Sequence, residues 1–234
     1  MTLKKALIFA IACTVASCAG SGNSDDPLGR SLGWFNFLDG TDLRRNCGQD
    51  GIDRYRFVYN GRWGEQVRIY EITRLGRGRA PAALSTRVLG RDFIGVIRTD
   101  DLLEPWRGTK SADSLSPAEM AEVDAALAAS GFDEPAPRGL NLPSDGFYWV
   151  VAVCRDNVFH FNAWNWPSDG FARLAFPAVL AEYDGTDIGF AEPRPGPTRI
   201  QATMGPTHDR AASYRAIFDL EVGDNGLKGI GALF

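Results

Sequence analysis

The most constraining feature of the chain is a pair of apolar stretches in its second half. Residues 147–154 and 158–166 are dense in β-branched and aromatic side chains, and three polar residues separate them. Such residues favour strands, and a short polar connection between two strands is typical of a β-hairpin. The sequence therefore predicts a hairpin that is buried along much of its length.

Three further pairs of stretches show strand character, with apolar and polar residues alternating. They are residues 53–60 with 65–72, residues 83–89 with 92–98 around Gly90, and residues 214–222 with 227–233. Turn-forming residues rich in glycine connect each pair, which again indicates hairpins.

The clearest helix signal lies in residues 116–130. Ser116 and Glu119 have the spacing of a capping box, with Pro117 between them at the first helical position, and Gly131 follows where the helix must stop. Helices are also expected in residues 31–46, interrupted near Asp39-Gly40, and in residues 171–183, kinked or restarted at Pro177.

Hairpins without a strand–helix–strand rhythm predict an α+β fold, a mainly antiparallel sheet with two or three packed helices. The 234 residues are 44% hydrophobic and 23% charged, which excludes a disordered tail, a collagen-like fibre and a multi-pass membrane protein. A net charge of −4 argues against a nucleic-acid binder. No shift in composition divides residues 31–234, so we expect one domain there.

The start of the chain has the pattern of an export signal. Lys4 and Lys5 precede a largely apolar, uncharged stretch at residues 6–15. A charged segment followed by a short apolar segment is typical of a secretory signal, and it is shorter than the roughly 20 apolar residues that span a bilayer.

The signal ends in Val15-Ala16-Ser17-Cys18, which resembles the lipobox of bacterial lipoproteins. The resemblance implies that residues 1–17 are removed and that Cys18 becomes the lipidated N-terminus. Ala19 follows where an aspartate would imply retention at the inner membrane, so the resemblance implies an outer-membrane lipoprotein with its domain in the periplasm. Residues 18–30 are small and polar, as in a flexible tether. A plain secreted protein cleaved nearby is the alternative.

The four cysteines then leave one pair for a disulfide. Cys13 would be discarded with the signal and Cys18 would be acylated, so Cys47 and Cys154 remain. Exported proteins meet an oxidising environment, which favours a bond between the two. Two separate buried thiols are the alternative.

Common catalytic and cofactor motifs are absent from the sequence: there is no G-x-S-x-G, H-E-x-x-H, C-x-x-C or Walker loop. The two histidines are His160, which stands in the middle of an expected strand, and His208, which stands in an expected loop. We therefore expect no metal centre and no cofactor.

One repeated motif is specific. Pro-Ser-Asp-Gly-Phe occurs at residues 143–147 and 167–171, on either side of the central hairpin. A two-residue turn at Asp156-Asn157 would set Trp149 opposite Trp164 and bring the two repeats together. Carboxylates and hydroxyls beside aromatic rings could bind Ca²⁺ or a sugar. The candidate ligand site consists of Ser144, Asp145, Trp149, His160, Trp164, Trp166, Ser168 and Asp169. Alternatively, the turns cap their own elements and the aromatic rings fill the core.

The sequence favours a binding or structural role in the cell envelope. The membrane would be contacted through the N-terminal lipid, and an envelope protein or a polysaccharide would be the partner, with no role for nucleic acid. The alternative is a hydrolase acting on cell wall or polysaccharide, with Asp145, Asp156 and Asp169 as general acids or bases.

Overall fold

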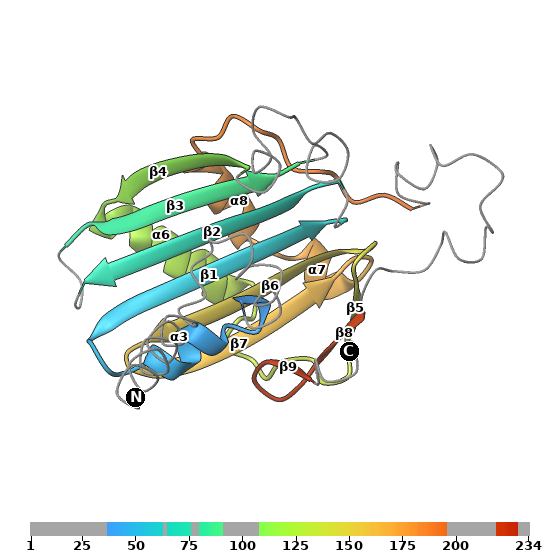
Figure 1. Ribbon diagram of the computed structural model, residues 1–234, viewed down its shortest axis with the longest axis horizontal. Coiled ribbons are helices and arrows are strands. Elements are labelled where there is room, and N and C mark those ends of the chain that lie inside the picture. Colours follow the sequence, from blue (N-terminus) through green and yellow to red (C-terminus); the bar gives the residue numbers. More distant parts are fainter. Residues whose placement is uncertain (1–36, 63–64, 76–79, 91–107, 196–218, 229–234) are drawn as a thin grey trace, which may run out of the picture.

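The structure, a computed structural model, describes residues 37–62, 65–75, 80–90, 108–195 and 219–228. Six strands form an antiparallel sheet in the order β4-β3-β2-β1-β6-β7, and a smaller sheet has the order β5-β8-β9 (Figure 1). The strands of the large sheet are β1 Ile52–Gly61, β2 Val67–Leu75, β3 Ala82–Leu89, β4 Thr109–Leu115, β6 Phe147–Arg155 and β7 Val158–Asn165. Those of the small sheet are β5 Asn141–Pro143, β8 Asp219–Val222 and β9 Leu227–Lys228. The predicted α+β class is confirmed.

The β6–β7 hairpin has the predicted register. Arg155 pairs with Val158 at the turn, and further along Trp149 pairs with Trp164. Asp156 and Asn157 have φ values of 53° and 66°, the left-handed conformation that a tight two-residue hairpin turn needs. The β1–β2 and β8–β9 hairpins are confirmed as well, over the residues that the structure describes.

The predicted pairing of residues 83–89 with 92–98 is wrong. Strand β3 lies between β2 and β4, so that Leu84 pairs with Ile72 on one side and with Asp113 on the other. Both edges of β3 are therefore occupied, while residues 92–98 lie outside the described residues. Strand β4 was missed because its sequence is polar and most of its residues are exposed.

Helix α6, Pro117–Ala129, has the predicted cap. The Glu119 amide donates to Ser116 Oγ (3.3 Å) and the Ser116 amide donates to the Glu119 carboxylate (2.6 Å). Gly131 ends the helical turn with φ of 75°. Because these interactions join residues close in the sequence, both ends of this helix could be predicted.

The other two expected helical segments are interrupted where predicted, and residues 31–36 of the first lie outside the described residues. Pro177 starts a new helix, α8 Phe176–Glu182, after the short α7 Asp169–Ala172, because proline is tolerated in a first helical turn. Helix α3, Thr41–Asn46, begins after Gly40, whose φ of 68° matches the predicted interruption. No helix among the described residues is both long and apolar enough to cross a membrane.

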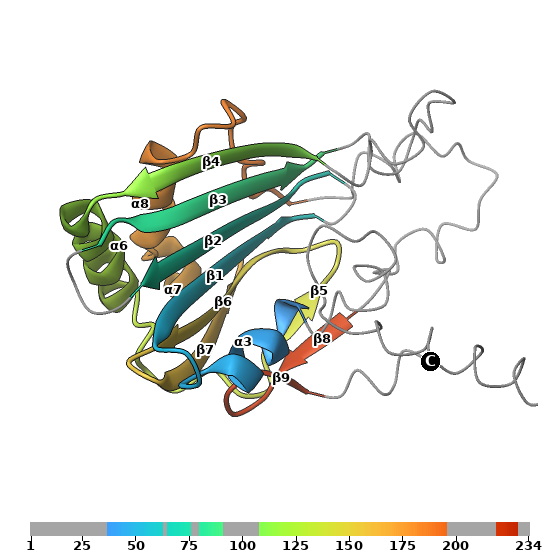
Figure 2. The same cartoon turned by 60° about the vertical axis from the view of Figure 1, so that its left-hand side comes forward.

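Both faces of the large sheet are packed (Figure 2). Helices α6 and α8 cover one face, over a core that includes Phe57, Val151 and Leu127. Helix α3 and the small sheet lie on the opposite face, over Val58 and Val150. Successive residues of β1 and β6 point to opposite faces, so these two central strands are buried on both sides.

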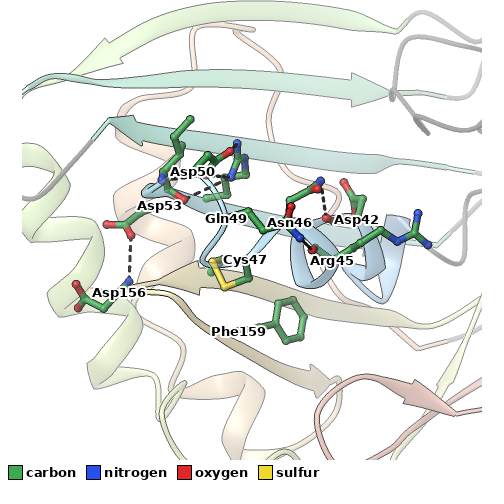
Figure 3. Close-up of a disulfide and its surroundings, with 12 residues drawn as sticks. Asp42, Arg45, Asn46, Cys47, Gln49, Asp50, Asp53, Asp156 and Phe159 are labelled. Carbon is green, nitrogen blue, oxygen red and sulfur yellow. Dashed lines mark hydrogen bonds and ion pairs between the residues drawn. A yellow bond between two sulfur atoms is a disulfide. The ribbon is translucent and has the colours of Figure 1, made fainter.

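The predicted disulfide joins the end of α3 to β6 (Figure 3). The Cα atoms of Cys47 and Cys154 are 5.5 Å apart, within the distance that a disulfide spans. Next to it, the Asp156 amide donates to the Asp53 carboxylate (3.0 Å), which ties the β6–β7 turn to β1. The bond thus fastens the end of α3 to β6 close to the β6–β7 turn.

Reduction of this disulfide should destabilise the domain. The sequence separation is 107 residues, and closing a loop of that size stabilises a fold by about 2–5 kcal/mol. Urea unfolding with and without dithiothreitol measures the difference, and a Cys47→Ala/Cys154→Ala variant should not respond to the reductant. Equal unfolding midpoints for the oxidised and reduced wild type would contradict the prediction.

Candidate functional site

Four large side chains form a row across the helix-covered face of the sheet. Arg68 lies opposite Tyr59, Tyr59 opposite Trp149, and Trp149 opposite Trp164, so the row crosses β2, β1, β6 and β7. Directly opposed residues on antiparallel strands share a face and contact one another. The Tyr59 and Trp149 ring centroids are 4.9 Å apart.

Two phenylalanines cover this row. Phe176 of α8 contacts Trp149 and Trp164, with ring centroids 5.1 and 5.6 Å away. Phe190, which follows α8 in the chain, contacts Tyr59 and Trp149 at 5.5 and 5.8 Å. The Arg68 guanidinium lies 4.2 Å from the Phe190 ring centroid. A helix covers one half of the row, and an irregular segment covers the other.

That segment, residues 188–194, is called the strap here. It belongs to neither helix nor strand. Gln66, which directly precedes β2, binds the main chain of the strap: its Nε2 donates to the Gly189 carbonyl, and its Oε1 accepts from the Ala191 amide, both at 2.9 Å. The Tyr59 hydroxyl donates to the Ala191 carbonyl at 2.6 Å.

Arginines hold both ends of the strap. Arg68 donates to the carbonyl oxygens of Ile188 and Gly189. At the other end, Arg62 donates to the Arg194 carbonyl (2.8 Å), and the Arg194 side chain pairs with Glu65. We call Tyr59, Arg62, Glu65, Gln66, Arg68 and Trp149 together the strap groove.

Arg68 is a buried charge with a buried counter-ion. Its side chain is 1% exposed and that of Asp184, with which it forms an ion pair, is 4% exposed. The Tyr70 hydroxyl donates to the same Asp184 oxygen (2.7 Å). Burial opposes ionisation of Asp184, but hydrogen bonds from Thr186 and Tyr70 and the charge of Arg68 outweigh it, so the pKa of Asp184 lies below its usual range.

The hollows in the described surface include two of several hundred Å³. One, of about 530 Å³, runs beside the strap and is lined by Glu65, Gln66, Gly90 and residues 188–194. The other, of about 480 Å³, lies between α3 and strands β1–β4. Its arginines are already engaged: Arg56 pairs with Asp42 and Glu71, and Arg54 pairs with Asp50. The hollow beside the strap is the one that adjoins the row of large side chains, and its Gln66 and Glu65 side chains bind the strap itself.

The aromatic members of the predicted ligand site belong mainly to the core. Trp149 is 2% exposed, as the packing alternative predicted. Trp164 is partly buried against Phe176, and Trp166 lies edge-on to Phe147 with ring centroids 6.0 Å apart. Because Trp149 is covered from above, it cannot serve as an open wall for a sugar.

His160 shares the face of Trp164, as the register predicts, but lies four residues away on β7. Its ring is 4.9 Å from that of Phe132, and its Nε2 is 3.3 Å from the Glu134 carbonyl oxygen. Four residues of strand span about 13 Å, which separates His160 from the row.

Each of the repeated turns is held by its own surroundings. Ser144 is buried, and its carbonyl accepts from Asn60 Nδ2 (3.0 Å), while Asp145 follows it in the turn after β5. Ser168 caps α7 by accepting from the Phe171 amide (3.1 Å), and Asp169 is the first residue of that helix. The meeting of the two turns stays a prediction. No group of three or more His, Cys, Asp or Glu that could hold a metal occurs in the described part of the chain.

The strap groove was not predicted from the sequence. The one local signal was Arg68, a charged residue on the face of β2 that also carries Tyr70. Its partner Asp184 is 116 residues away, and no spacing rule links the two. Comparison of the chain with protein-family models, curated proteins and solved structures gave no match.

Replacement of the buried carboxylate tests how the strap groove is held together. Asp184→Asn should lower the free energy of unfolding at pH 7 by about 3 kcal/mol, because it leaves the buried Arg68 without its counter-ion. The pKa of Asp184 is depressed in the folded state, so its contribution is present above the unfolded-state value of about 3.9 and is lost as pH falls below it.

Urea unfolding at pH 7 and pH 3 measures both effects. The exposed Asp187→Asn is the matched control and should leave stability unchanged within about 0.5 kcal/mol. The difference between wild type and Asp184→Asn should shrink at pH 3. An Asp184→Asn variant as stable as Asp187→Asn at pH 7 would show that the ion pair does not support the fold.

Proposed function

We propose that this chain is an exported, lipid-anchored protein of the cell envelope whose domain binds a partner. The observation that carries the proposal is the Cys47–Cys154 disulfide. Disulfides persist in oxidising compartments, which agrees with the signal and the lipobox ahead of the domain. The lipid would be attached at Cys18, and residues 18–30 would tether the domain to the outer membrane, facing the periplasm.

A binding role accounts for the domain better than hydrolysis does. Asp156 lies in the β6–β7 turn, whereas Asp145 and Asp169 flank the opposite end of the same hairpin. The nine residues of β6 span roughly 30 Å, so Asp156 cannot share a cleft with the other two. A hydrolase would therefore depend on Asp145 and Asp169 without Asp156. A protein segment is the partner that the strap groove suits best, ahead of a polysaccharide.

Lipidation at Cys18 is tested in bacteria that process lipoproteins. Mass spectrometry of the native N-terminal peptide should find acyl chains on Cys18, since stable anchoring needs two acyl chains or their equivalent. Cys18→Ala should release the protein from the membrane fraction. Cys13→Ala is the matched control, because it alters a cysteine of the same signal and leaves the lipobox intact. A wild-type protein that is soluble and unacylated would overturn the proposal.

A further inference from the structure

We propose that the strap groove is a peptide-binding site, with the strap as its intramolecular occupant and an extended segment of a partner protein as its exchangeable ligand. This site rests on the binding role proposed above and gives the chemistry of the partner. The groove contacts the main chain of the strap through side chains.

The contacts to the main chain are independent of sequence. The Gln66 amide donates to the carbonyl of Gly189 and accepts from the amide of Ala191, and Tyr59 donates to the carbonyl of Ala191. These are groups that a neighbouring β-strand would otherwise bind, and every residue except proline presents both of them. Any segment that presents a carbonyl and, two residues later, an amide and a carbonyl to Gln66 and Tyr59 can therefore be held in the same way.

Specificity comes from two side-chain positions. Phe190 fits against Tyr59 and Trp149 with the Arg68 guanidinium on its ring, an environment that favours an aromatic residue. Four residues later, Arg194 pairs with Glu65, whose side chain is 4% exposed. The groove thus selects an aromatic residue followed, four positions on, by a basic residue.

The strap can leave without breaking the sheet. None of its residues belongs to a strand, and Ile188 and Glu192 are exposed. Asp184 and Tyr70, which pair with Arg68, stay in place when residues 188–194 move away, so the charge of Arg68 keeps its counter-ion. A hollow of about 530 Å³ already runs beside the strap and gives an incoming segment access to Gln66.

Binding of a peptide to the whole chain tests the proposal. The probe is a fluorescein-labelled peptide with the sequence of residues 186–195, which carries the phenylalanine and the arginine at the strap spacing. The wild-type strap competes at an effective concentration of order mM, so the peptide should bind the wild type weakly. In Phe190→Ala the competitor loses its anchor, and fluorescence anisotropy should give at least about tenfold tighter binding.

Two controls define the site. Adding Gln66→Ala to Phe190→Ala should abolish binding, whereas adding the exposed Gln49→Ala should not alter it. A peptide with alanine in place of its phenylalanine should bind at least tenfold more weakly. Arg194→Ala is the second variant in case Phe190→Ala fails to fold, and it should also bind the peptide more tightly than wild type because it removes the pairing with Glu65.

Failure to bind the peptide in a folded Phe190→Ala or Arg194→Ala variant would overturn the peptide-binding site. Equal binding by the Gln66→Ala double variant would do so as well. The measurement uses purified protein in solution and does not depend on acylation. A negative result here therefore leaves the lipidation of Cys18 standing, and loss of the lipid anchor would leave peptide binding standing.

Discussion

The part of the helix-covered sheet face that lies under the strap depends on one interaction, the pairing of the buried Arg68 guanidinium with Asp184. A charge that is 1% exposed must be paired, because desolvation of an unpaired ion costs several kcal/mol. Asp184 supplies the counter-charge, the carbonyls of Ile188 and Gly189 accept two more hydrogen bonds, and the Phe190 ring covers the guanidinium. Arg68 therefore favours the return of the chain from α8 to the sheet, while Asp184 alone keeps its charge paired when the strap leaves.

The rest of the fold makes that return possible by holding the sheet rigid. Strand β1 pairs with β2 on one side and β6 on the other, which fixes Tyr59 between Arg68 and Trp149. On the opposite face, the disulfide and the two-point pairing of Arg56 with Asp42 fasten α3 to the sheet. The groove residues on strands, Tyr59, Arg68 and Trp149, are fixed from behind and keep their positions when the occupant changes.

Features governed by local rules were predictable from the sequence. The Asp156-Asn157 turn predicted the β6–β7 register, and the capping box predicted the start of α6. The disulfide joins distant residues, but it was predictable because only Cys47 and Cys154 lie outside the signal and the lipobox. Strand β4 escaped prediction because an exposed edge strand needs no apolar alternation. The strap groove escaped it because its contacts join residues more than 110 positions apart.

The predicted ligand site shows the same limit of sequence-based prediction, which does not reveal contacts between distant segments. The register that placed Trp149 beside Trp164 was right, but α8 and the strap cover Trp149, and neither covering element follows from the hairpin. Sequence periodicity tells which face of a strand a side chain occupies. It does not tell which distant segment covers that face, and that segment decides whether an aromatic residue is a binding surface or a core residue.

Hydrogen exchange of the Ala191 amide shows whether the strap opens, because this proton is donated to Gln66 only while the strap occupies its groove. An exchangeable strap lets Ala191 exchange through a local opening, with a free energy well below that of the amides of β1, which exchange on global unfolding. Phe190→Ala should lower the opening free energy of Ala191 further and leave that of β1 less affected. If Ala191 exchanges only with global unfolding, at the same free energy as β1, the strap is a fixed part of the fold and cannot be exchanged for a partner.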